Sequence, residues 1–345
     1  MLNRSESATF DPSAVAQSAN GIFGLPFTTE NAGTIVVPVP WEVTTSYGDG
    51  TADGPDAIVA ASAQVDLYHP DFPDAWKTGI ALSDVSTTWH AQSDRWKPIA
   101  KQLIDAQIDG IDIAGDSELS TRQSEVNEAC SAVHSELERQ VDHWVSLGKK
   151  VIVLGGDHSV SLGALRSVGR RYPEFGVLQF DAHMDLRSAY EGFTYSHASI
   201  MYNALEIPSL TSLVQVGIRD YCEAELAVVT RENPRIHVVT DHQIKDSQFA
   251  GVPWQVQCDG IVEKLPTHVY ISFDIDALHP SLCPNTGTPV PGGLQLEEAV
   301  YLIKRLIRSG RTVVGIDLVE VSPGADEWDA NVGARLLYAL FGYWQ

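Results

Sequence analysis

Basic residues are scarce in this chain. Lysine and arginine together number 23 against 45 aspartate and glutamate residues, which gives a formal net charge of -22. Phosphate groups repel such a protein, so we expect neither nucleic acid nor an anionic membrane surface as a partner. A small cationic substrate suits the acidic field, although most of the excess acids are explained by solubility alone.

Cysteines and long apolar runs are scarce as well. The four cysteines, Cys130, Cys222, Cys258 and Cys283, are scattered and form no CxxC pair, which argues against a disulfide framework. No apolar run approaches the 18 or so residues of a membrane span, and no signal-peptide pattern opens the chain. We therefore expect a cytoplasmic protein with reduced thiols.

Strand-like and helix-like segments alternate along most of the sequence, without repeats or a linker. Such alternation predicts an α/β fold with a parallel sheet covered on both faces by helices. We expect a single three-layer α/β/α domain over residues 34–345 with a mainly parallel sheet of about eight strands. The expected strands are 34–39, 80–82, 151–154, 176–180, 213–217, 236–239, 268–274 and 312–318.

The first 33 residues form a separate N-terminal extension in this interpretation. They are rich in serine, alanine and asparagine and contain one apolar stretch, GIFGLPF at 21–27. Two interpretations stay open: an ordered extension that lies against a neighbouring subunit, or a tail held down by Phe23 and Phe27.

Polar side chains cluster where three of the expected strands end. The carboxyl ends of parallel strands open onto one crevice, so these side chains should converge there. A lone aspartate or histidine at a strand end is more often a helix cap or a surface residue, but six of them at three strand ends indicate a site. They are His158, Asp181, His183, Asp185, Asp274 and Asp276.

The spacing and charge of these residues predict metal ions. Asp181 and His183 are two residues apart, as are Asp274 and Asp276, so each pair points to the same side of an extended chain. Converging aspartates repel one another, and divalent cations relieve the repulsion. Mixed imidazole and carboxylate ligands suit Mn, Ni, Fe or Zn, and they are too many for one tetrahedral zinc. Two ions sharing bridging aspartates are the economical solution.

Six short motifs stand out in the sequence: GGDHS at 155–159, DAHMD at 181–185, YSHAS around His197, SFDIDALHP at 272–280, NTGTPVPGG at 285–293 and DLVEVSP at 317–323. Together they resemble the motifs of the ureohydrolase family, which includes arginases and agmatinases. The resemblance runs from about residue 34 to the C-terminus and is greatest to agmatinase-like guanidine hydrolases.

The resemblance implies hydrolysis of a guanidinium C–N bond with release of urea. It also implies two divalent metal ions per chain, Ni or Mn, and a homo-oligomer, either a trimer or a hexamer. By motif, His158, Asp181, Asp185 and Asp274 would bind one ion, and His183, Asp181, Asp274 and Asp276 the other.

Three catalytic roles follow by the same resemblance. Asp185 would accept a hydrogen bond from the metal-activated water, and Glu320 would hold the guanidinium by paired charge-assisted hydrogen bonds. His197 would pass a proton to the leaving amine. The residues alone favour a functional role for Glu320 over that of an ordinary surface acid, because it ends an apolar strand at the same sheet edge. For His197 they leave a structural and a functional role equally open.

The substrate is a separate question. The segment LRSAYEGFTYSHAS does not reproduce the arginase loop that holds the amino-acid end of arginine, which argues against arginine. Trp328 either caps the pocket by stacking on a small cation or is buried at a subunit contact. We predict free guanidine or a small alkylguanidine, with agmatine, a guanidino acid, formiminoglutamate and a non-catalytic subunit as alternatives. His279 stands where the family usually has aspartate; it belongs to the surrounding loop contacts or reaches the crevice.

Overall fold

An eight-stranded sheet forms the centre of the molecule in our computed structural model, which describes residues 10–16, 20–84 and 87–345. The strand order is β2-β1-β3-β8-β7-β4-β5-β6, and each of these neighbours pairs in parallel. The strands are β1 (Thr34–Val39), β2 (Ile80–Leu82), β3 (Lys150–Gly155), β4 (Phe175–Phe180), β5 (Leu210–Ile218), β6 (Ile236–Thr240), β7 (His268–Asp274) and β8 (Thr312–Val319).

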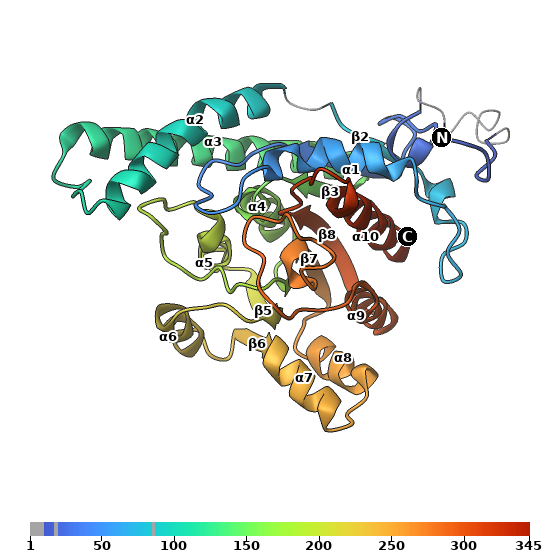
Figure 1. The fold of residues 1–345 in the computed structure, drawn as a ribbon. Helices are drawn as coiled ribbons and strands as arrows, with labels where there is room; N and C mark the ends of the chain where they lie inside the picture. The colour runs from blue at the N-terminus through green and yellow to red at the C-terminus, as the bar shows by residue number, and fades with distance from the viewer. Residues whose placement is uncertain (1–9, 17–19, 85–86) are drawn as a thin grey trace.

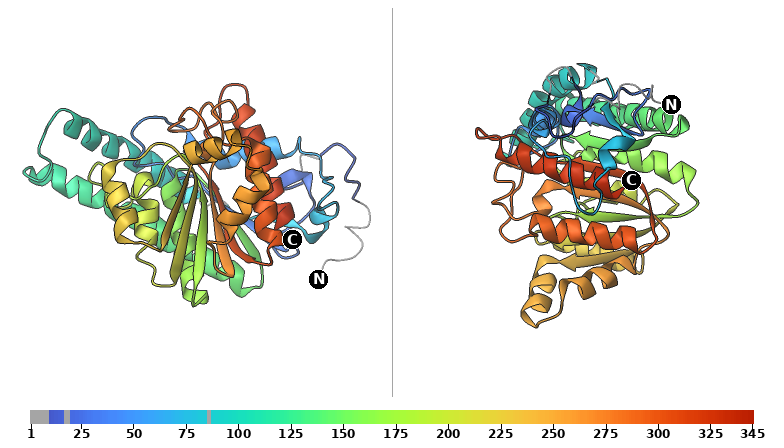
Figure 2. Two further views of the ribbon diagram at one scale, coloured as in Figure 1. Left: turned by 90° about the horizontal axis from the view of Figure 1, so that it is seen from below. Right: turned by 90° about the vertical axis from the view of Figure 1, so that its right-hand side faces the viewer.

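Helices cover both faces of the sheet and complete three layers (Figures 1 and 2). One face packs against α4, which in turn contacts α3 and α5; the other packs against α1 and α10, followed by α9 and α8. The helices are α1 (Gly54–Ser62), α2 (Thr87–Ile108), α3 (Ser117–Ser146), α4 (Ser161–Arg171), α5 (Ile200–Ala204), α6 (Glu223–Arg231), α7 (Asp241–Phe249), α8 (Trp254–Val262), α9 (Leu296–Arg308) and α10 (Trp328–Tyr343).

The central strands are apolar on both faces because helices exclude water from both sides. Every residue of β1 and β4 is buried, and so is every residue of β7 except His268. Such strands read as continuous apolar runs, and this made them visible in the sequence. The predicted α/β/α architecture is confirmed.

Two helices depart from the prediction. Helix α7 was not predicted, because it shows little apolar periodicity; a capping box starts it, in which Thr240 and Gln243 bond each other's backbone N–H. Helix α2 begins at Thr87, whereas the sequence pattern predicts a helix only over about 96–107. With α3 it forms a hairpin that extends beyond the sheet (Figure 2, left).

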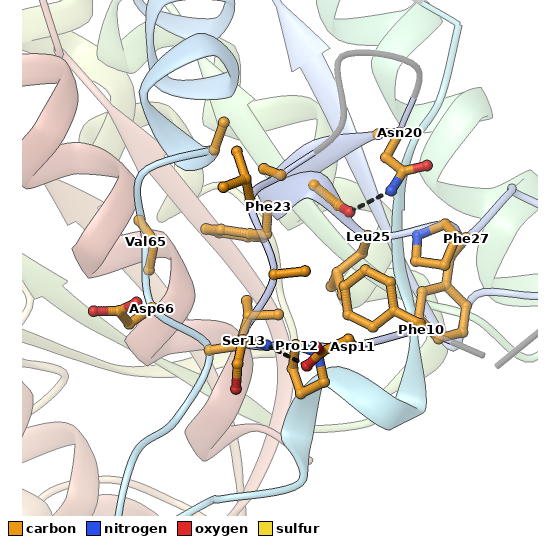
Figure 3. Close-up of a pocket in the computed structure, with 18 of the residues that line it drawn as sticks. Phe10, Asp11, Pro12, Ser13, Asn20, Phe23, Leu25, Phe27, Val65 and Asp66 are labelled. Atoms are coloured by element: carbon orange, nitrogen blue, oxygen red, sulfur yellow. Dashed lines mark hydrogen bonds between the residues drawn. The ribbon is translucent and has the colours of Figure 1, made fainter. Parts of the chain in front are cut away.

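The N-terminal segment packs on the domain through its apolar stretch. Phe23 and Phe27 are buried, and the backbone N–H of Phe23 donates to Ser62 Oγ at 2.9 Å. A hollow of about 880 Å³ is lined by residues of the segments 10–16, 20–28 and 63–67 (Figure 3). The rest of the predicted extension, residues 1–9 and 17–19, lies outside the described residues.

Among the described residues, no helix combines the length and apolar character needed to cross a lipid bilayer.

Candidate metal centre

The predicted ligands lie at the carboxyl edge of four adjacent strands. Strand β8 pairs with β3 on one side and with β7 on the other, and β7 also pairs with β4. His158 follows β3, Asp181 follows β4, Asp274 ends β7 and Glu320 follows β8. Neighbouring strands lie about 4.8 Å apart, so these loops share one small space.

A first group of donors surrounds the ring of His158. Its Nδ1 lies 3.1 Å from Asp181 Oδ2, 3.1 Å from Asp185 Oδ2 and 3.4 Å from Asp274 Oδ2. All four side chains are at least 94% buried. His158, Asp181 and Asp185 are arranged so that they could hold one ion.

A second group lies beside the first and shares Asp181. His183 Nδ1 lies 3.5 Å from Asp181 Oδ1 and 3.0 Å from Asp276 Oδ2. These three residues could hold another ion. Because the two oxygens of Asp181 face different histidines, its carboxylate has the orientation of a bridge between two ions.

Two buried atoms that make no hydrogen bond support the fit of this donor set to divalent metals. His158 Nδ1 and Asp276 Oδ2 are fully enclosed and lie near groups of opposite charge, but neither makes a hydrogen bond, whereas buried polar atoms normally do. Imidazole nitrogen and carboxylate oxygen are the ligands that Mn and Ni accept. The predicted ligands therefore surround a place where a cation would satisfy both atoms.

The electrostatics of the cluster also favour cations. Burial opposes the charged form of His158, but Asp181, Asp185 and Asp274 raise its pKa well above the ordinary value. In the same way burial opposes the charge on His183, while Asp276 and Asp181 raise its pKa to about 12. Carboxylates that hold positive charge on two imidazoles attract metal cations by the same force.

Side chains that the sequence interpretation missed hold these ligands in place. Ser272 Oγ lies 2.9 Å from His158 Nε2 and donates to Asp317 at 3.0 Å, which leaves Nδ1 facing the aspartates. Gln179 Nε2 donates to Asp181 Oδ2 at 2.8 Å. Partners of this kind orient metal ligands. The signal that could have found them is a polar residue inside an otherwise apolar strand, such as Asp317 in GIDLVE at 315–320.

The backbone is strained at two of the predicted functional residues. Asp185 has φ of 55° and Glu320 has φ of 63°, a region that non-glycine residues seldom adopt. Such a conformation costs about 1–3 kcal/mol and clusters at active sites. At Glu320 the surrounding structure compensates, because its backbone N–H donates to Gly156 O and Thr286 Oγ1 donates to its carbonyl.

A pocket of about 150 Å³ is lined by residues of the cluster and by Glu320. Glu320 is 6% exposed, and its carboxylate accepts a hydrogen bond from the backbone N–H of His158 at 2.8 Å. Burial and the negative charge of Asp157 raise the pKa of Glu320 well above its ordinary value. The remaining lining comes mainly from loops and turns, with one residue from the first turn of α6. It consists of Ser46, Arg187, Tyr190, His197, Ala198, Asp220, Tyr221, Glu225 and Thr288, beside His158, His183, Asp185 and Asp274.

His197 lies in this lining, at the start of the turn that leads into α5. Its ring packs edge-on against Tyr190, with 6.3 Å between the ring centroids. Burial, together with the positive charges on His183 and His158, lowers the pKa of His197 to about 4. The residue that the sequence assigns to proton transfer therefore lies in the pocket, beside two residues of the cluster.

Trp328 and His279 lie outside the pocket lining. The indole of Trp328 donates from Nε1 to Ser281 O at 2.9 Å, and 43% of the residue is exposed. His279 Nδ1 lies 2.8 Å from the hydroxyl of the same Ser281. Within one chain, Trp328 thus does not cap the pocket, because its indole is held on the 281 turn.

The family model that describes the arginase family matches residues 32–342. The chain belongs to the arginase family. It is 32% identical over 313 residues to the N(1)-aminopropylagmatine ureohydrolase of Thermus thermophilus. The aligned region covers 91% of this chain and 90% of the relative. It is 29% identical over 318 residues to the agmatinase of Neisseria gonorrhoeae, covering 90% of this chain and 86% of the relative.

Solved structures show the same arginase-family fold. The agmatine ureohydrolase of Thermoplasma volcanium superposes with a TM-score of 0.68 at 23% identity, over 99% of this chain and 97% of the other. The proclavaminate amidino hydrolase of Streptomyces clavuligerus gives a TM-score of 0.70 at 24% identity, over 96% and 99%. The resemblance to the ureohydrolase family predicted from the sequence is confirmed.

Proposed function

We propose that this protein hydrolyses the guanidinium group of an alkylguanidine that carries an amine tail, as agmatine does, and releases urea. Two observations support this most: Asp181 is shared between His158 and His183, and Glu320 lines the same pocket as both histidines. Water adds to the guanidinium carbon and the carbon–nitrogen bond to the tail breaks. One alkylguanidinium and one water become one alkylammonium and one urea, so the charge is conserved.

Two divalent ions at the cluster would act as Lewis acids and lower the pKa of bound water toward neutrality. The six predicted ligands would hold them, and we propose manganese or nickel, of which nickel binds more tightly in the Irving–Williams order. The side chains that we assign as ligands are His158, Asp181, His183, Asp185, Asp274 and Asp276.

Three side chains of this chain carry out the remaining steps. Glu320 accepts hydrogen bonds from two guanidinium N–H groups and fixes the target carbon above the cluster. Asp185 accepts a proton of the attacking water. His197, which lines the same pocket, relays that proton to the departing amine nitrogen and so returns to its starting state.

The tail of the substrate reaches the exposed part of the pocket lining. Asp220 lies there as a carboxylate that attracts an amine tail, beside the 40% exposed Tyr221. Trp328, the residue expected to restrict the pocket to small guanidines, lies outside the lining. The pocket thus has room for a tail toward solvent, and relatives with 29–32% identity are named for agmatine and aminopropylagmatine.

Free guanidine is the second candidate, and the small volume of the pocket, about 150 Å³, favours it. We further propose that the enzyme is a cytoplasmic homo-oligomer, a trimer or a hexamer as family members commonly are.

Urea release by the purified chain tests the proposal. The protein is stripped of metal and reloaded separately with Mn and Ni, then given agmatine, N(1)-aminopropylagmatine, guanidine, methylguanidine, 4-guanidinobutyrate and arginine. We expect the highest kcat/KM for an amine-tailed substrate. A preference for guanidine would select the second candidate, and metal-loaded protein that releases no urea from any of them would overturn both.

A further inference from the structure

The 42–53 loop between β1 and α1 forms one wall of the pocket. Ser46 of this loop belongs to the lining. The backbone of Thr44 lies close enough to His197 to influence the pKa of its imidazole. The position of this loop therefore sets the width of the pocket and the surroundings of the histidine that serves the leaving group.

The same loop is fastened to two other segments of the site. The backbone N–H of Gly48 donates to Gly287 O at 3.0 Å, and Ser322 Oγ donates to Asp49 O at 2.9 Å. Gly287 precedes the lining residue Thr288. A shift of the loop would consequently move several parts of the pocket together.

Glu42 holds the loop in its bent form from inside. Its carboxylate is almost fully buried and accepts hydrogen bonds from the backbone N–H groups of Gly50 at 2.9 Å and Ala52 at 3.1 Å. Thr45 Oγ1 donates to the other oxygen at 3.1 Å. Gly50 has φ of 110°, a backbone conformation that glycine adopts without steric cost, and this lets its N–H point at the Glu42 carboxylate.

Helix α2 supplies the cation that matches this buried charge. Lys97 Nζ contacts Glu42 Oε1 and lies 2.9 Å from Asp49 Oδ1, so one ammonium bridges both ends of the bend. Ser93, one turn earlier, accepts from the backbone N–H of Glu42 at 2.9 Å. Removing one partner of a buried ion pair leaves an uncompensated charge and is strongly destabilising locally.

We propose that Lys97 is a positioning residue for the hydrolysis: through Glu42 and Asp49 its ammonium fixes the 42–53 loop, and thereby Ser46 and the Thr44 backbone, against the pocket. The role in hydrolysis rests on the proposed function. Lys97 touches no predicted metal ligand, so metal binding does not depend on it.

Three variants test this proposal: Lys97→Met, which keeps the apolar stem, Lys97→Arg, which keeps the charge, and Lys101→Met, a matched control on the exposed side of α2. We expect Lys97→Met to lose roughly tenfold or more in kcat/KM with unchanged bound metal, because small misplacements in a site are costly. Lys97→Arg should recover most of the loss, and Lys101→Met should match the wild type.

Hydrogen–deuterium exchange gives a readout that does not need activity. Peptides covering residues 44–53 should exchange faster in Lys97→Met than in the wild type, while peptides covering 176–185 should not change. Wild-type kinetics in Lys97→Met, an equal loss in Lys101→Met, or a loss of metal with activity would each overturn the proposal. If the wild type releases no urea, the proposed function fails. The proposal that Lys97 fixes the 42–53 loop is then tested by exchange alone, and equal exchange of residues 44–53 in Lys97→Met and the wild type would overturn it.

Discussion

The metal cluster and the pocket wall above it are built in different ways. The cluster consists of side chains that directly follow the ends of central strands, and nearly all are more than 90% buried. The wall consists mainly of residues from loops, and several of them, such as Asp220 and Tyr221, are exposed. The sheet thus fixes the positions of the cluster side chains, whereas the positions of the wall residues depend on contacts between separate loops.

Because of this difference, the residues that determine the reaction type are distinct from those that determine substrate preference. Strand ends hold ligands at set positions, so the chemistry is common to proteins that share the sheet edge. Loops tolerate substitution far better, and binding residues concentrate there. We infer that the arginase-family chemistry of this chain belongs to the cluster and that its substrate preference belongs to the wall.

The largest effect should come from the shared carboxylate. Asp181→Asn removes one charge that faces both histidines, so both ions should be lost and urea release should fall by more than the roughly 10–100-fold typical of outer-shell changes. Metal analysis and urea assays on the same sample measure this. A variant that keeps two metals per chain and its activity would contradict the bridging assignment.

At the border between cluster and wall, Glu320→Gln should separate metal binding from substrate binding. The amide oxygen can still accept from the His158 N–H, but the charge that faces the guanidinium is gone. We expect bound metal to persist and kcat/KM to fall, by an amount that corresponds to a rise of about 2–5 kcal/mol in activation free energy. Loss of metal in this variant would assign Glu320 to the cluster instead.

The pH dependence of folding stability should show how acid unfolds the protein, separately from any effect of acid on the metal cluster. His134 on α3 is buried beside Tyr195, with neither ring nitrogen hydrogen-bonded, and burial lowers its pKa to about 3. Below the ordinary pKa of about 6.5, the unfolded chain binds a proton that the folded protein excludes. This residue should therefore destabilise the fold by about 1.4 kcal/mol per pH unit between pH 6.5 and 3.

Urea-induced unfolding across this pH range measures the effect. His134→Phe keeps a ring against Tyr195 and should flatten the pH dependence, whereas His242→Gln should not, because the side chain of His242 is 85% exposed. An unchanged slope in His134→Phe would show that acid acts elsewhere.

The smallest effects should come from the wall and should depend on the substrate. Asp220→Asn should raise KM for agmatine by a factor of a few, about 0.5–1 kcal/mol as for exposed ion pairs, and leave guanidine unaffected. Arg187, which lies over the Tyr190 ring at 4.8 Å, has the opposite charge, so Arg187→Met should spare agmatine and weaken 4-guanidinobutyrate. Equal changes for all three substrates would place both residues outside tail recognition.

The fold and the cluster could be anticipated because their signals are local. Alternation of apolar runs with amphipathic segments predicts a parallel sheet, and the two-residue spacing from Asp181 to His183 and from Asp274 to Asp276 gives each pair a common direction in any strand end. Helix α7 could not be found this way because its stability comes from its cap and not from an apolar stripe.

Strand order and loop contacts were decided only by the tertiary structure. Nothing in the sequence says that β8 inserts between β3 and β7, yet this pairing brings Asp317 to the Ser272 hydroxyl and Glu320 to the backbone of His158. Likewise the contact between Lys97 and Glu42 spans 55 residues. Ligand spacing is a property of the local backbone and is visible in sequence, whereas neighbours in space depend on how the whole chain minimises its exposed apolar surface.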